Sequence, residues 1–349
     1  MEPKLLTRDQ FREGVFARDK GKCVFCDLPA QDAHHILERR LWPDGGYYLE
    51  NGASVCGGHH MACEMTTISV EDVRHAAGIT KIHVPDQFYP DHIYDKWGNP
   101  ILEDGRRGKG ELFFDESVQK VLGQGGVLDL FTDYVKYGRT FHLPNSPGIH
   151  DDDKALKDYS NFEGKRVIIS MKMDGENTTG YSDGHIHARS IDSRGGEDRA
   201  WVKQFLSQIL YELPPGWRIC GENMWAEHSI HYDDLPSYFL GFSIWDERGV
   251  CLSWDDTKQW FELLGIQTPK IRYDGMFDMR ALQMIERSLD FFEDEGYVIR
   301  IADAFSYKDF KNSIAKWVRA GHVQTARHWR AGGRFRPNGL ASDSSDSTD

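Results

Sequence analysis

The chain has 349 residues, a formal net charge of −13 and 40% hydrophobic residues, which is typical of a folded globular protein with room for two domains. It contains no run of eighteen apolar residues and no signal-peptide pattern at its start, so we expect a cytoplasmic protein without a membrane partner. The acidic total excludes an evenly basic surface but leaves open a local basic stripe for nucleic acid.

Cysteines and histidines gather near the N-terminus. Four of the six cysteines lie there and two stand alone in apolar surroundings: Cys23, Cys26, Cys56 and Cys63, then Cys220 and Cys251. In a reducing compartment, clustered cysteines indicate a metal site, whereas isolated apolar ones indicate core packing. Cys23 with Cys26, and Cys56 with His59, have the spacing of a structural Zn²⁺ site with a ββα unit between the pairs. Cys63 competes with His59 as the fourth ligand.

The same part of the chain carries a second group of polar residues: His34, His35, Asn51, His60 and Glu64. His60 and Glu64 are four residues apart, so on a helix they share one face. Residues 1–80 thereby resemble the HNH endonuclease motif, which implies a ββα-metal domain with a divalent metal at its site. The resemblance implies that His34, His60 and Glu64 bind the metal. It further implies that His35 is the general base and that Asn51 orients this base. The family more often has histidine at the position of Glu64.

Residues 81–136 are poorly patterned. Glycine, proline and aspartate recur between Trp97 and Gly110, which predicts turns and a linker between two domains. A short helix is predicted at 115–122. Residues 138–148 are predicted to form an ordered loop that leads into the second domain.

Residues 137–330 alternate strand-like runs with amphipathic segments. Apolar runs bounded by turn residues predict strands at 167–171, 218–225, 238–246 and 296–302. Apolar residues at helical spacing predict helices from Trp201 to Leu210 and through Trp260, the second with Asp256 as its cap. We therefore expect an α+β domain with antiparallel sheets and flanking helices.

The first of these strands leads into Lys172-Met173-Asp174-Gly175. A lysine at a strand end, beside a carboxylate and a glycine that lets the backbone approach a ligand, is suited to attack a nucleotide phosphate. To attack the α-phosphate of ATP the amine must be deprotonated, so we expect burial and nearby cations, including a bound metal, to lower the pKa of Lys172.

Charged and aromatic residues follow at the predicted strands downstream. Glu222 and Glu295 can bind ribose hydroxyls or hold Mg²⁺ or Mn²⁺. Phe242 can stack on the purine. Lys316, or alternatively Lys311, can bind the α-phosphate oxygens and stabilise their negative charge while the P–O bond is exchanged.

In their order along the chain, these motifs resemble those of the ATP-dependent RNA ligases, which are covalent nucleotidyltransferases unrelated to ATP-grasp enzymes. The resemblance implies that Lys172 is the adenylated nucleophile. It also implies that Glu222 contacts the ribose, that Phe242 stacks on the adenine and that Glu295 organises the metal. Arg189 is similar in position to the arginine that contacts the nucleotide or the RNA end. The expected pair of lysines one residue apart is absent, which leaves Lys316 and Lys311 as alternatives.

Basic residues strongly outnumber acidic ones from Lys308 to Arg336, with Trp317 and Trp329 among them. This stripe is suited to hold a phosphate backbone, so RNA is the expected partner, with DNA or a hybrid as alternatives. Residues 331–349 are predicted to be a disordered polar tail.

Two motif sets in separate domains favour an ATP-dependent polynucleotide ligase joined to an HNH-type nuclease. One alternative is an HNH phosphodiesterase whose C-terminal domain only binds nucleotide. Another is a ligase whose zinc module only binds nucleic acid, and a third is a non-catalytic nucleic-acid binder. The oligomeric state is not predicted.

Overall fold

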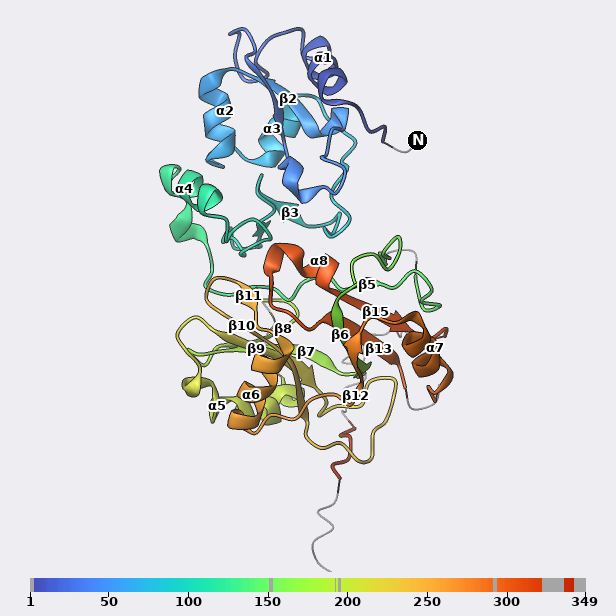
Figure 1. Ribbon diagram of the computed structural model, residues 1–349. Helices are drawn as coiled ribbons and strands as arrows, with labels where there is room; N and C mark the ends of the chain where they lie inside the picture. Colours follow the sequence, from blue (N-terminus) through green and yellow to red (C-terminus); the bar gives the residue numbers. More distant parts are fainter. Residues whose placement is uncertain are drawn as a thin grey trace, which may run out of the picture. The chain divides into compact units, whose positions relative to one another are not determined.

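The computed structural model describes residues 3–150, 153–191, 193, 196–290, 294–321 and 336–341. The chain divides into two compact units, 1–135 and 136–349 (Figure 1). Within the described residues, no helix combines the length and the apolar character needed to cross a membrane.

The first unit contains a short ββα arrangement. Its helices are α1 (Arg8–Arg18), α2 (Gly57–Glu64), α3 (Val70–Ala76) and α4 (Glu116–Gln124). Its strands are β1 (Asp32–His35), β2 (Gly52–Val55), β3 (Ile93–Tyr94) and β4 (Pro100–Ile101), with 3-10 turns at Arg39–Leu41, Leu49–Asn51 and Leu128–Leu130. β1 pairs antiparallel with β2, and α2 follows after a single residue, Cys56. Capping boxes start α1 at Thr7 and α3 at Ser69.

The segment that the sequence predicts as a linker, 81–136, belongs instead to the core of the first unit. Phe88, Tyr94, Trp97, Leu112 and Phe113 are buried together with apolar side chains of the ββα part. The predicted helix is present as α4, which Asp115 caps. The linker prediction is wrong because it reads turn residues as mobility, although turns also connect short packed segments.

The second unit is built on two sheets. The six-stranded sheet has the order β14-β11-β10-β9-β7-β8 and the five-stranded sheet the order β12-β6-β13-β15-β5. In chain order the strands are β5 (Phe141–His142), β6 (Arg166–Lys172), β7 (Glu176–Tyr181), β8 (Ile186–Ala188), β9 (Arg218–Asn223), β10 (Phe239–Trp245), β11 (Val250–Cys251), β12 (Ile271–Met276), β13 (Gly296–Ile301), β14 (Phe305–Ser306) and β15 (Ile314–Val318). All neighbours are antiparallel except β15 and β5, which are parallel. The predicted α+β class with antiparallel sheets is confirmed.

Helices cover the outer faces of both sheets. They are α5 (Ala200–Ser207), α6 (Trp254–Leu264), α7 (Met279–Arg287) and α8 (Phe310–Ser313), with 3-10 turns at Glu197–Arg199, Leu210–Glu212 and Tyr307–Asp309. α5 and α6 pack on the six-stranded sheet through a cluster that includes Ile219 and Ile244, and α7 packs near Tyr297 of the five-stranded sheet (Figure 1). Ser253, and not the predicted Asp256, caps α6, because its hydroxyl accepts the Asp256 N–H.

The C-terminal part differs most from its prediction. Residues 308–319 are a 3-10 turn, the four-residue α8 and β15, and Trp317 is buried against Tyr297. Of residues 336–341 in the predicted disordered tail, Asn338 is buried at 3% exposure and its neighbours are half-buried or exposed. The remaining residues of that tail, and the basic stripe from 322 to 335, lie outside the described residues.

Candidate active site

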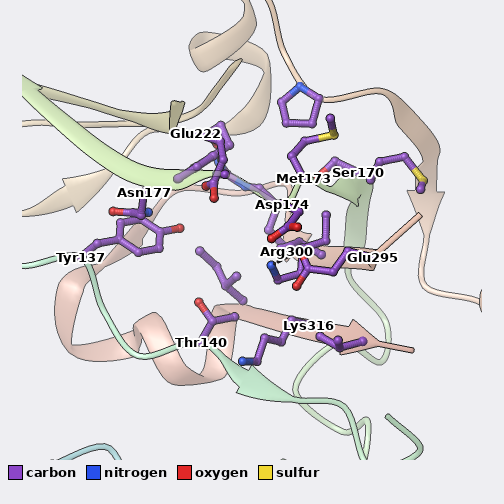
Figure 2. Close-up of a pocket in the computed structure, with 18 of the residues that line it drawn as sticks. Tyr137, Thr140, Ser170, Met173, Asp174, Asn177, Glu222, Glu295, Arg300 and Lys316 are labelled. Carbon is purple, nitrogen blue, oxygen red and sulfur yellow. Dashed lines mark hydrogen bonds and ion pairs between the residues drawn. The ribbon is translucent and has the colours of Figure 1, made fainter. Parts of the chain in front are cut away.

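A cavity of about 610 Å³ lies between the two sheets of the second unit, a size that suits a nucleotide. It is lined by nearly all the predicted nucleotide-site residues: Lys172, Asp174, Gly175, Arg189, Glu222, Phe242, Glu295 and Lys316. Figure 2 shows Glu222, Asp174, Glu295 and Lys316 around the same space. Lys311 lies on α8 and is not among the described residues that line the cavity.

Sheet register brings Lys172 and Glu295 together. β6 and β13 are antiparallel neighbours with Lys172 opposite Gly296, so Glu295, just before β13, lies at the end of β6. The Lys172 ammonium donates to Glu295 Oε2 at 2.6 Å. Gly296 allows β13 to lie close to β15, because a Cβ at this position would collide with the carbonyl oxygen of Trp317. Its φ of +154° also favours glycine.

The charge around Lys172 differs from the prediction. Burial lowers the pKa of Lys172, but the carboxylates of Glu295 and Glu222 outweigh it, so that the net pKa lies above its ordinary value. The nearest strong charges are carboxylates and not the cations that the sequence analysis expects. With these neighbours the lysine is held as an ammonium.

Asp174 and Gly175, beside the cavity, fix the backbone that follows Lys172 through hydrogen bonds and close packing. Asp174 Oδ2 accepts from Ser229 N at 2.7 Å, Ser229 Oγ at 2.6 Å and Ile230 N at 3.0 Å. Burial raises the pKa of Asp174, but the Ser229 hydrogen bonds outweigh it and keep the carboxylate charged. A Cβ on Gly175 would lie 2.6 Å from the carbonyl oxygen of Asn223. Close packing on β9, in addition to the predicted approach of a ligand, therefore requires this glycine.

Phe242 lies at an irregularity of β10, where the register shifts between Gly241 and Ser243. Its ring meets Tyr137 edge-on, with 5.3 Å between ring centroids, and both residues line the cavity. The Arg300 guanidinium donates to the Phe242 carbonyl at 3.3 Å and fixes the irregular strand. The sequence analysis missed Tyr137 and Arg300, which carry no motif letter of their own.

Lys316 ends the cavity opposite Glu222. Its ammonium lies 3.6 Å from Asp153 Oδ1, and the other oxygen of Asp153 lies 3.2 Å from His142 Nε2. Burial, together with the positive charges of Lys172 and Arg189, lowers the pKa of Lys316 against the pull of Asp153. The sequence analysis missed His142 and Asp153, because neither stands in a recognisable motif.

A comparison with protein-family models finds a match to the part of the chain that contains most of the cavity residues. Residues 165–318 match the RNA ligase family model. This matched region extends from β6 to β15 and includes Lys172 and Lys316. No match to the chain was found among curated proteins.

Solved structures match parts of the chain at low sequence identity. An archaeal ATP-dependent RNA ligase is similar at 18% identity and a TM-score of 0.37, over 46% of this chain and 44% of that one. Two variants of the Naegleria gruberi RNA ligase, one with ATP and Mn and one with AMP and Mn, are similar at 15% and 16% identity. Each has a TM-score of 0.37 over 54% of this chain and 56% of its own. The chain therefore spans about half the length of these proteins.

Glu222 gives the matched region a pH dependence that stability measurements can detect. Burial, with the nearby Glu295 charge, raises the pKa of Glu222 to about 8 despite the opposing Lys172. The folded state therefore binds this proton more tightly than the unfolded state, and stability falls as pH rises from about 4.5 towards 8. Glu222→Gln lacks the titration, so we expect the free energy of unfolding of this variant, relative to that of the wild type, to rise by on the order of 4 kcal/mol across that window.

Urea unfolding of both proteins at several pH values between 5 and 8 measures this gain. Glu262→Gln, which changes an exposed carboxylate of α6, is the matched control and should keep a constant difference from the wild type. A constant difference for Glu222→Gln as well would contradict the assigned burial of Glu222.

Four potential zinc ligands converge in the first unit: Cys23, Cys26, Cys56 and His59. Their ligand atoms lie within 4.8 Å of one another, and His59 Nδ1 is 3.2 Å from Cys56 Sγ and 3.6 Å from Cys26 Sγ. A tetrahedral Zn²⁺ site has about 3.6 Å between sulfur and nitrogen ligands. The His59 N–H hydrogen bond and the His59 ring lower the pKa of Cys56 to about 6. Cys63 lies outside this group, in the apolar core.

A second cluster lies where β1 faces α2. His34, His60 and Glu64 place one ligand atom each within 4.8 Å of one another, as the sequence predicts. His35 follows on the opposite face of β1, where its ring stacks on Phe11 at 4.5 Å. The structure therefore does not bring His35 into this cluster.

Asn51 and Lys96 support the same cluster. Asn51 is buried and exchanges two hydrogen bonds with the backbone of Leu37, so it fixes the chain that leaves β1. Lys96 was missed because it stands in the predicted linker. The Lys96 side chain is 4% exposed, and its ammonium donates to the His35 carbonyl at 2.9 Å and lies 3.1 Å from Glu64 Oε1. Burial and Lys96 lower the pKa of His34 to about 3, which keeps its ring neutral at pH 7.

Proposed function

We propose that the chain is an ATP-dependent RNA ligase that acts through a lysyl-AMP at Lys172. The observation that carries the proposal is the pairing of Lys172 with Glu295 at the wall of a nucleotide-sized cavity. Both residues lie within the region that matches the RNA ligase family model. In the first step Lys172 Nζ loses a proton and bonds to the α-phosphorus of ATP, and the bond to pyrophosphate breaks. AMP is then transferred to a 5′-phosphate, and a 3′-hydroxyl attacks to release AMP.

The residues around the cavity divide these tasks. Phe242 and Tyr137 offer aromatic surface to the adenine, and Glu222 offers a carboxyl group to the ribose. Lys316 offers a positive charge to the α-phosphate oxygens, and its place in the cavity favours it over Lys311.

Glu295 also has the donor chemistry for a divalent cation. It would hold Mg²⁺ or Mn²⁺, which neutralises charge on the triphosphate and on the leaving pyrophosphate. When Glu295 is engaged in this way, Lys172 loses its ion-pair partner and burial then lowers its pKa towards the neutral amine. The test is covalent labelling of the chain by ATP that carries label in the α-phosphate, with Lys172→Ala as the decisive variant.

We also propose that the first unit is a metal-dependent nuclease, which the approach of His34, His60 and Glu64 favours. Two imidazoles and a carboxylate can hold a divalent metal that stabilises the charge of the scissile phosphate. The HNH resemblance gives His35 the role of general base, although its ring lies on the opposite face of β1 from the three ligands, against Phe11. The structural zinc would stabilise the fold of this unit, and the alternative is a module that binds nucleic acid without cleavage.

Cleavage and metal binding separate these alternatives. We expect His60→Ala to weaken binding of Mn²⁺ by at least about tenfold and to abolish nicking, because it removes one of three ligands. His35→Ala should abolish nicking but keep Mn²⁺ binding. Calorimetric titration with Mn²⁺ and nicking of labelled RNA and DNA measure the two effects. His75→Ala, an exposed histidine of α3, is the control. Unchanged Mn²⁺ binding in His60→Ala would refute the site.

A further inference from the structure

The backbone that follows Lys172 is held by one loop. This motif loop, residues 224–238, connects β9 to β10 and has no regular secondary structure. Ser229 and Ile230 of the loop donate three hydrogen bonds to Asp174, and the Asp174 N–H donates to the Tyr232 hydroxyl at 3.2 Å. Both the side chain and the backbone of Asp174 thus take their position from the motif loop.

Apolar packing joins the same segments. Met224 and Leu235 of the motif loop are buried with Leu240 of β10, and Met173, between Lys172 and Asp174, packs against them. The position of Met173 therefore also depends on the conformation of the loop.

The motif loop is in turn held by residues 336–341, which we call the C-terminal clasp. Asn338 is its centre: its side chain accepts from Tyr232 N at 3.0 Å and donates to the Met224 carbonyl at 2.7 Å. The Asn338 N–H donates to the Trp225 carbonyl at 3.0 Å, and its carbonyl accepts from the Tyr238 hydroxyl at 2.8 Å. A single buried residue thus bonds to the start, middle and end of the loop.

Backbone pairing extends the clasp on both sides of Asn338. Glu227 N donates to the Arg336 carbonyl at 2.8 Å, and Gly339 N donates to the Tyr232 carbonyl at 2.7 Å. A Cβ on Gly339 would lie 2.6 Å from the carbonyl oxygen of Asp233, so the clasp fits the loop closely. The clasp supplies the backbone partners that a neighbouring strand would supply in a sheet.

We propose that Asn338 is a positioning residue for adenylylation of Lys172, acting through Tyr232 and Asp174. The inference rests on the proposed function, because it assigns the clasp to the first step of that reaction. Asn338 sets the Tyr232 backbone, the Tyr232 hydroxyl and Ser229 set Asp174, and Asp174 sets the chain two residues after the nucleophile. The segment at 336–341 is therefore part of the active-site framework, although it touches none of the reacting atoms.

A double-mutant cycle tests this chain of contacts. We expect Asn338→Ala and Tyr232→Phe each to lower the maximal single-turnover rate of adenylylation by about tenfold, with a smaller change in the ATP concentration at half-maximal rate. The double variant should lose little more than either single variant, because both changes break the same connection. Additive losses would overturn the proposal, since a merely structural role predicts independent effects.

Asn145→Ala is the matched control. It removes an asparagine of the same unit that bonds to Tyr159 and Glu286 but does not contact the motif loop. A rate for Asn338→Ala equal to that of Asn145→Ala would also overturn the proposal. If Asn338→Ala fails to fold, Asn338→Ser takes its place in the cycle under the same criteria. Absence of labelling in the wild type would instead refute the proposed function.

Discussion

Replacing Lys172 by alanine is expected to abolish covalent labelling of the chain by ATP labelled in the α-phosphate. The lysines among the described residues that line the cavity are Lys172 and Lys316, and Lys316 is engaged with Asp153. Removing the Lys172 amine leaves Lys316 as the one lysine among the described residues of the cavity lining, so the label should fall at least about a thousandfold. Label that resists denaturation and is released as AMP by acid measures the phosphoramidate.

Variants at the other two lysines separate attack from charge stabilisation. Lys316→Ala should slow labelling by roughly a hundredfold without removing it, because its positive charge acts on the phosphate and forms no bond. Lys311→Ala is the matched control and should label like the wild type, since Lys311 lies outside the cavity lining. Label that survives in Lys172→Ala contradicts the assigned nucleophile. Equal losses in Lys311→Ala and Lys316→Ala contradict the choice of Lys316.

Much of the cavity was predictable from sequence because its charged residues interrupt apolar strands. Lys172, Glu222 and Glu295 each stand at or beside a strand end, where a charged residue next to a buried run is visible in the local pattern. Strand pairing then brings these ends together, although Lys172 and Glu295 are far apart in the chain. The residues that form the cavity wall without such a pattern, such as Tyr137 and Asp153, were missed.

Other features depend on contacts that leave no local signal. The Asn338 side-chain amide bonds to backbone groups of the motif loop more than a hundred residues away, and backbone partners leave no residue-type signal in the loop sequence. The raised pKa of Lys172 has the same origin, because it results from the carboxylates of Glu295, just before β13, and of Glu222 on β9. The segment 81–136 is different: its buried aromatic residues, Phe88 and Trp97 among them, were a visible sign of a core, and its glycines were given too much weight.

Loss of one zinc ligand is expected to unfold the zinc-binding part of the first unit while leaving adenylylation intact. Cys56 is both one of the four proposed zinc ligands and the residue that precedes α2, which carries His60 and Glu64. Cys56→Ser should therefore lower zinc content from one per chain and reduce the free energy of unfolding of this unit by on the order of 3 kcal/mol. It should also weaken Mn²⁺ binding, because α2 loses its anchored start.

Two controls accompany this experiment: a cysteine of the first unit outside the proposed zinc site, and the adenylylation activity of the second unit. Cys63→Ala removes a buried cysteine of α2 outside the ligand group, so it should retain one zinc per chain by atomic absorption; loss of zinc in this variant alone would restore Cys63 as the fourth ligand. The core clusters of the first and second units share no residue, which is why labelling of Lys172 should continue in Cys56→Ser. If labelling is lost together with zinc, the two units do not fold independently, and the separate assignment of ligase and nuclease chemistry fails.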